Sequence, residues 1–204
     1  MTTLLDRRHT LTLMSAAAIA ALLPLPAFAQ TDPAAAQVQG FYDALVAQMK
    51  KGGGARARYD MLKPAVEKAF DLSGMTAVAV GPTWASIPAG EQKALIDAFE
   101  RLTIANYVGN FNSFGGEQFT VDPAPVPRGA EKLIRSKLVS GKETIPFNYR
   151  MRQVNGDWKI FDIFLNGNIS QMAQKRSDFA ATLASSGPSG LAKRINALAD
   201  QQLS

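Results

Sequence analysis

The sequence predicts an α+β fold: a curved antiparallel sheet of about four strands, covered on one face by helices from both ends of the chain. Two patterns support this prediction. Helical spacing of apolar residues fills the first half of the chain and its end, whereas alternation of apolar and polar residues is concentrated between residues 117 and 165. In addition, Asn155 and Gly156 separate two alternating segments, and both residue types tolerate the positive φ that a tight hairpin turn needs.

The hairpin around this turn is the clearest element. From 144 to 152 every second residue is apolar, which is typical of a strand with one buried face. The returning segment, 158–165, is apolar on nearly both faces and should lie deeper in the sheet. Two earlier strands are expected at 117–121 and 131–140, and a helical pattern begins near residue 169.

Helices are expected wherever apolar residues recur with a period near 3.6. The expected helices cover about 38–51, 55–69, 75–80 and 88–113 before the sheet, and two segments after it separated by Gly187 and Pro188. Pro64 predicts a kink or break in the second helix because proline lacks the backbone N–H that helix hydrogen bonding needs.

The first 29 residues have the pattern of a secretory signal peptide. Arg7 and Arg8 precede an apolar run at 11–25, and Ala27 and Ala29 supply the small residues that signal peptidase reads. The run is too short for a lasting membrane anchor. We therefore expect cleavage after Ala29, ordinary unfolded secretion in preference to twin-arginine export, and a single domain over residues 30–204.

Composition excludes several kinds of chemistry. The chain has no cysteine, and its one histidine, His9, lies in the expected signal peptide. Disulfides, thiolate nucleophiles, the usual zinc sites and a Ser-His-Asp triad are thereby excluded from the mature chain, so no cofactor or metal is expected. The formal net charge of +5 is mild, and the basic residues are scattered, so no nucleic-acid partner is expected.

Three blocks of sequence resemble the MlaC family of periplasmic phospholipid-shuttling proteins, also called toluene tolerance proteins. The blocks are Phe70-Asp71-Leu72-Ser73-Gly74-Met75 with Trp84, Phe99-Glu100-Arg101-Leu102 with Tyr107, and Trp158-Lys159-Ile160-Phe161-Asp162 through Gly167 to Arg176-Ser177-Asp178-Phe179. The last block is especially similar to the hopanoid-associated HpnM branch. The resemblance implies an NTF2-like or MlaC-like sheet and a soluble periplasmic carrier of a phospholipid or hopanoid-type lipid.

The resemblance also implies partners. The carrier would be the substrate-binding component of an ABC/MCE-type transport system, exchanging lipid between an inner-membrane complex and an outer-membrane lipoprotein complex, and we expect it to be a monomer. Exposing an acyl chain of about sixteen carbons costs about 12 kcal/mol at about 0.8 kcal/mol per methylene, so a carrier must enclose its ligand's acyl chain or polycyclic apolar body. The candidate lipid-binding residues are Trp84, Phe99, Leu102, Tyr107, Phe111, Phe147, Tyr149, Met151, Ile160, Phe164 and Met172.

Asp162 lies in a strand of apolar neighbours, where an ionised carboxylate needs a partner. We favour a structural role as a hydrogen-bond acceptor for a nearby backbone amide, arginine or tyrosine. Among the arginines, Arg176 is the expected partner by family position, with Arg150 and Arg152 as rivals. The alternative role is that of a general base in a small-molecule enzyme. A third possibility is that the protein is a ligand-free adaptor of a membrane complex.

Overall fold

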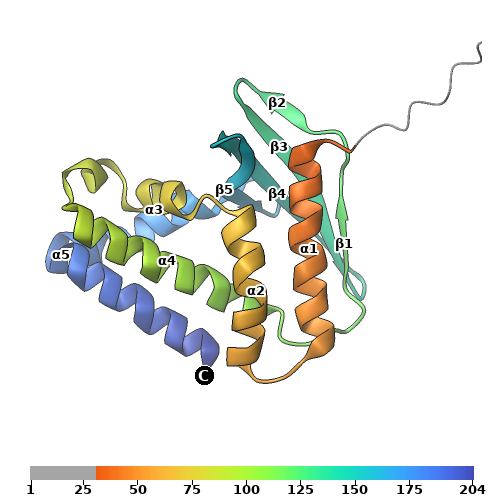
Figure 1. Cartoon of the computed structure of the whole chain (residues 1–204), viewed down its shortest axis with the longest axis horizontal. Coiled ribbons are helices and arrows are strands. Elements are labelled where there is room, and N and C mark those ends of the chain that lie inside the picture. The colour runs from red at the N-terminus through yellow and green to blue at the C-terminus, as the bar shows by residue number, and fades with distance from the viewer. Residues whose placement is uncertain (1–30) are drawn as a thin grey trace, which may run out of the picture. The chain divides into compact units, whose positions relative to one another are not determined.

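The computed structural model describes residues 31–204, so the expected signal peptide lies outside the described residues. The chain folds in the order α1 (Pro33–Lys51), α2 (Ala55–Ala69), α3 (Leu72–Val80), the 3-10 helix η1 (Pro82–Ser86), α4 (Ala89–Asn110), β1 (Gln118–Val121), β2 (Val126–Arg128), β3 (Glu131–Ser140), β4 (Glu143–Val154), β5 (Asp157–Leu165), β6 (Ile169–Ser170) and α5 (Gln171–Leu203) (Figure 1). The α+β class and the placing of helices at both ends are confirmed. No helix in residues 31–204 has the length and hydropathy that crossing a bilayer requires.

The sheet has six strands, two more than expected. Its order is β1-β3-β4-β5-β6, with β2 also pairing with β3, and every pair is antiparallel. The two strands that were not expected are short. β2 contains Pro127, which an edge strand tolerates because its missing N–H is not needed by a neighbour, and β6 has only two residues. Neither is long enough to show alternation.

The central hairpin forms as expected, and a bulge follows its turn. Asn155 and Gly156 both have positive φ, 53° and 89°. Farther along β5 the pairing shifts: Met151 lies opposite Ile160, but Arg150 lies opposite Asp162, which leaves Phe161 as the extra residue. A bulge reverses which residues of a strand face the helices, and this reversal determines the composition of the cavity described below.

The helices follow the predicted ranges, with differences at some of their ends and at Pro64. α2 runs through Pro64 without a break, and α4 ends at Asn110 rather than near residue 113. The break expected between two C-terminal helices is present: α5 consists of two helical segments that meet at a kink at Gly187, whose φ of 65° is not helical. β6 occupies the first two residues of the expected helix, so α5 begins at Gln171.

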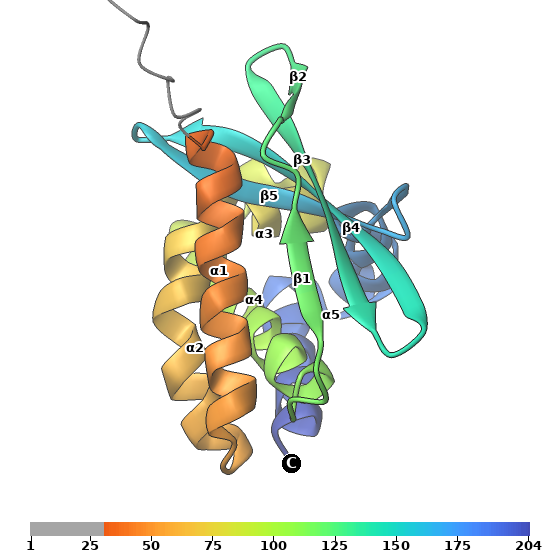
Figure 2. The same cartoon turned by 90° about the vertical axis from the view of Figure 1, so that its right-hand side faces the viewer.

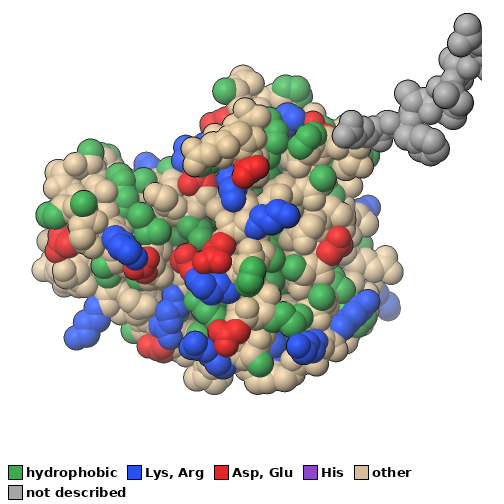
Figure 3. Space-filling model, viewed as in Figure 1, with side chains coloured by type: hydrophobic (Ala, Val, Ile, Leu, Met, Phe, Trp, Pro, Cys, Tyr) green, Lys and Arg blue, Asp and Glu red, His purple; other side chains and the backbone are tan. Residues whose placement is uncertain are grey.

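The helices cover one face of the sheet, as burial along β3 shows. Ile134, Ser136 and Leu138 are buried, whereas Arg135 and Lys137 between them are exposed. Figure 2 shows the helices gathered on one side of the strands. On the surface seen in Figure 3, basic side chains are interspersed with acidic ones.

The helices do not all pack on the sheet. α1, α2, α3 and α5 approach the strands, whereas α4 packs chiefly on α5, α2 and α3. Between the strands and the helices lies a core of large buried side chains. It includes Phe41, Tyr42, Leu45, Leu62, Ile134, Tyr149, Met151 and Ile160. The separation between α4 and the sheet is where the candidate site lies.

Candidate functional site

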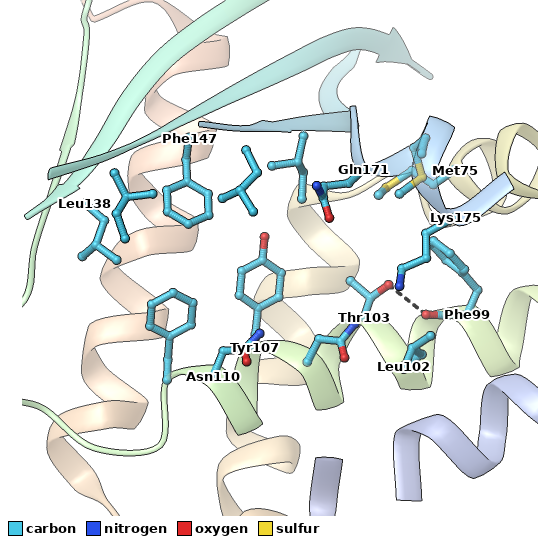
Figure 4. Close-up of a pocket in the computed structure, with 16 residues that line it drawn as sticks. Met75, Phe99, Leu102, Thr103, Tyr107, Asn110, Leu138, Phe147, Gln171 and Lys175 are labelled. Carbon is cyan, nitrogen blue, oxygen red and sulfur yellow. Dashed lines mark hydrogen bonds between the residues drawn. The ribbon is translucent and has the colours of Figure 1, made fainter. Parts of the chain in front are cut away.

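A cavity of about 550 Å³ lies between α4 and the sheet. Figure 4 shows side chains of α4 on one side of it and side chains of the strands on the other, with the start of α5 and Met75 of α3 at one end. Sixteen residues line it, and ten of these are aliphatic, methionine or phenylalanine. They are Met75, Phe99, Leu102, Thr103, Asn106, Tyr107, Asn110, Phe111, Leu138, Ile145, Phe147, Ile163, Leu165, Gln171, Met172 and Lys175.

The α4 wall is one stripe along a helix. Phe99, Thr103, Asn106 and Asn110 recur every three or four residues, which places them on a common face. The Thr103 hydroxyl donates to the Phe99 carbonyl at 2.8 Å, so this polar group is satisfied within its own helix (Figure 4). The hydroxyl therefore does not need a hydrogen-bond partner on the ligand.

The sheet wall consists of apolar residues that lie opposite one another on neighbouring strands. Leu138 of β3 pairs with Ile145 of β4, and Phe147 of β4 pairs with Leu165 of β5. Apart from the buried Leu138, these side chains are only partly buried. Alternation gives each strand one apolar face toward the helices, and because α4 does not pack against that face, the side chains border open space.

Three tyrosines at and beside the cavity are uncharged at neutral pH. Burial raises the pKa of Tyr42 to about 12 and raises the pKa of both Tyr107 and Tyr149 well above the ordinary value of 10.0. The Tyr42 hydroxyl lies 2.7 Å from the Ser136 hydroxyl. Tyr107 lines the cavity, where its neutral ring presents an apolar surface.

Six of the eleven expected lipid-binding residues lie on the cavity: Phe99, Leu102, Tyr107, Phe111, Phe147 and Met172. Tyr149, Met151 and Ile160 belong instead to the closed core, where each is 0% exposed. Trp84 lies in η1 and packs, partly buried, against that core.

Phe164 is the most informative discrepancy. Ile163 and Leu165 line the cavity, so Phe164 between them lies on the other face of β5. The bulge at Phe161 explains the difference, because Ile160 faces the helices before it and the odd-numbered residues face them after it. Simple alternation from Ile160 would place Phe164 inside.

Other cavity residues were missed, although the sequence held a signal for some of them. Ile145 continues the alternation of 147, 149 and 151, and Asn106 and Asn110 share the helical face of Phe99. Both asparagines are polar, whereas the expected lipid-binding residues were almost all apolar or aromatic. No sequence pattern predicts that Gln171 and Lys175 line the cavity, because their position depends on where α5 begins.

Asp162 accepts hydrogen bonds from backbone amides, one of the expected kinds of partner, and not from any arginine that the structure describes. Its carboxylate accepts from the backbone N–H of Ile163 at 2.8 Å, from the Ser170 hydroxyl at 2.6 Å and from the Met172 N–H at 3.1 Å. The expected partner Arg176 donates instead to the Val78 carbonyl at 2.8 Å. Asp162 thus ties β5 to the start of α5, and it is not among the residues that line the cavity.

The rival arginines are also paired elsewhere. Arg150 pairs with Glu131 at 2.6 Å, and the Arg152 Nε donates to Asp71 at 2.8 Å. Asp71 in turn accepts from the Gly74 N–H at 2.9 Å and so caps α3. The Phe70–Met75 block therefore has an identifiable structural role in joining α3 to the sheet.

An α+β shell with a largely apolar cavity defines a protein that binds an apolar or amphipathic small molecule. Residues 38–197, which make up more than half of the chain, match the family model described as MlaC protein. The chain belongs to the MlaC family.

A solved structure has the same fold. A phospholipid-binding protein from Ralstonia solanacearum, determined in complex with a phospholipid, matches with a TM-score of 0.74 at 20% sequence identity. The match covers 85% of this chain and 100% of that one. Comparison with the curated proteins gave no match.

Proposed function

We propose that this chain is a periplasmic lipid carrier that encloses the apolar part of its ligand between α4 and the sheet. The observation that carries the proposal is the cavity itself: about 550 Å³ bordered by large, partly buried apolar side chains. A methylene occupies about as much volume as a water molecule, about 30 Å³, so the cavity has room for roughly eighteen methylenes. That is one long acyl chain. Membership of the MlaC family and the fold shared with a phospholipid-binding protein support the same ligand class.

The energetics of transport agree with this geometry. Each methylene that stays out of water is worth about 0.8 kcal/mol, so a chain enclosed along its length is protected against loss to the solvent. The wall residues Phe147 and Leu165 supply apolar contact, and Tyr107 is neutral. A second acyl chain would need more room, which separation of α4 from the strands would supply.

Mass spectrometry of the protein from its own host tests the proposal. The full chain, with its leader, is expressed in the host and purified from the periplasm, and native spectra are compared with spectra after denaturation. We expect a bound mass that disappears on denaturation, and an intact mass that begins at Gln30, which is the product of cleavage after Ala29. Protein that is consistently empty would favour the ligand-free adaptor.

Analysis of the extracted ligand separates the finer alternatives. A glycerophospholipid would support the general MlaC role, and a polycyclic triterpenoid would support the HpnM-like one. Transfer assays with the expected inner-membrane ABC/MCE-type complex and outer-membrane lipoprotein complex then test the partners. Transfer of bound lipid to neither complex would contradict the carrier role in such a transport system.

A further inference from the structure

Lys175 is the one charged side chain among the sixteen residues that line the cavity. It lies on α5, one helical turn after Gln171, which also lines the cavity. Figure 4 shows both residues at the same end of the cavity as Met75, with the Lys175 side chain extending toward Phe99 and the α4 wall. A cation therefore stands at one end of an otherwise uncharged lining.

The charge of Lys175 is only weakly compensated within the described part of the chain. Its ammonium lies 3.9 Å from the carboxylate of Asp178, at the limit of an ion pair, and the Asp178 side chain is 48% exposed. A contact of this length to a hydrated carboxylate contributes little. Arg150, by contrast, lies 2.6 Å from its acidic partner Glu131.

Surroundings of this kind favour an incoming anion. The Lys175 side chain is 28% exposed, and its cavity neighbours include Met75 and Phe99, which offer its ammonium group no negative charge. A carboxylate or phosphate at the end of an acyl chain would supply the missing counter-charge, and the Gln171 amide could donate to the same group.

The other end of the cavity suits the tail. Leu138 lies at the end opposite Lys175 in Figure 4, and its cross-strand partner Ile145 also lines the cavity. The lining thus carries a charge at one end and none at the other, and its volume of about 550 Å³ corresponds to roughly one acyl chain at about 30 Å³ per methylene.

We propose that the cavity selects amphipathic lipids with an anionic end group, held by Lys175 and Gln171 while one acyl chain extends toward Leu138. This inference rests on the proposed function and narrows it to a ligand class. The shared chemistry is an anionic oxygen group on a single enclosed chain. Its source is either the carboxylate of a fatty acid or the phosphate of a phospholipid.

Three probes with the same oleoyl tail test the selectivity: oleate, oleoyl lysophosphatidic acid and monooleoylglycerol, which is neutral. Their affinities for delipidated mature protein are measured by displacement of a fluorescent fatty acid. We expect both anionic probes to bind the wild type about tenfold more tightly than the neutral probe, the usual effect of one charge-assisted hydrogen bond. Lys175→Gln should reduce that ratio to near one, and Lys175→Arg should retain it.

Lys193→Gln is the matched control, because it makes the same change at an exposed position of α5 outside the cavity lining. It should keep the wild-type ratio, and circular dichroism should show all variants folded. If Lys175→Gln loses more affinity for oleate than for lysophosphatidic acid, the carboxylate is the preferred group. If it loses more affinity for lysophosphatidic acid, the phosphate is the preferred group.

Two results would overturn the inference. If Lys175→Gln keeps the wild-type ratio, Lys175 does not recognise the anion. If the wild type binds all three probes equally, there is no anion selectivity, although the carrier function stands. Failure of all three probes to bind the wild type would count against the proposed function itself, so the two failures are distinguishable.

Discussion

Phe147→Asp should remove lipid binding while leaving the fold intact. Phe147 lies near the middle of β4 with its ring on the cavity wall, opposite Tyr107 of α4 (Figure 4). Its ring covers about three methylenes of an enclosed chain, so its removal costs about 2.5 kcal/mol of binding free energy. A carboxylate placed against the chain adds a desolvation cost of at least about 1 kcal/mol. Together these terms weaken binding by more than about a hundredfold.

The fold should tolerate the change because the site borders open space. Phe147 is only partly buried, so a hydrated carboxylate can remain in the cavity of the empty protein, and the Ser136 hydroxyl still donates to the backbone carbonyl at position 147. We expect a loss of about 1–3 kcal/mol in the free energy of unfolding. The far-ultraviolet circular dichroism spectrum should not change.

Thr144→Asp is the matched control for this prediction. Thr144 is an exposed residue of the same strand, and alternation places it on the face away from the cavity. The control adds the same charge and should copurify with lipid at the wild-type level, as measured by native mass spectrometry. If Phe147→Asp copurifies with as much lipid as Thr144→Asp, the cavity wall has been assigned to the wrong surface.

Three further predictions concern stability. Asp162→Asn should lower the free energy of unfolding by about 1–3 kcal/mol, because it weakens charge-assisted hydrogen bonds that hold the start of α5. The variant should keep its bound lipid. Loss of lipid from a variant whose stability in urea is unchanged would contradict the structural role. Because burial raises the pKa of Tyr42 to about 12 while the unfolded chain titrates at 10.0, the folded state keeps a proton that the unfolded state loses. The free energy of unfolding should therefore fall by about 1.4 kcal/mol per pH unit between these values from this tyrosine alone, and urea titrations of Tyr42→Phe should show a shallower fall. Asp71→Asn should keep the α3 cap but lose the ion pair with Arg152, which should lower the free energy of unfolding by about 1–2 kcal/mol. An unchanged melting temperature would refute that contribution.

The sequence was most informative where a local rule decides the structure. Asn155 and Gly156 predict a turn because both residue types tolerate positive φ. The alternating residues on either side predict the two strands that this turn joins, and the central hairpin forms there. The range of α4 was predicted to within about three residues. Periodicity indicated its cavity-facing stripe but not which neighbour the stripe would face.

What the sequence could not supply depends on contacts between distant segments. The bulge at Phe161 depends on how β5 pairs with β4, and no residue type near it predicts the shift in pairing. The position of Lys175 depends on β6 delaying the start of α5 until Gln171. The arginine expected to pair with Asp162 was wrong for a related reason: the donors are backbone N–H groups, two of them brought together by the junction of β5 with α5, and residue types alone do not show which of these N–H groups will be near.

The packing of α4 on other helices, rather than on the strands, has a consequence for the empty protein. In most α+β domains the side chains of helix and sheet complete each other's hydrophobic core, whereas here an enclosed acyl chain would take the place of those missing contacts. The cargo would then act as a removable component of the folded structure. Ligand at about a thousand times its dissociation constant adds about 4 kcal/mol to stability, so release of the ligand would leave the protein in its least stable form. Reloading would restore both the cargo and the rigidity of the shell.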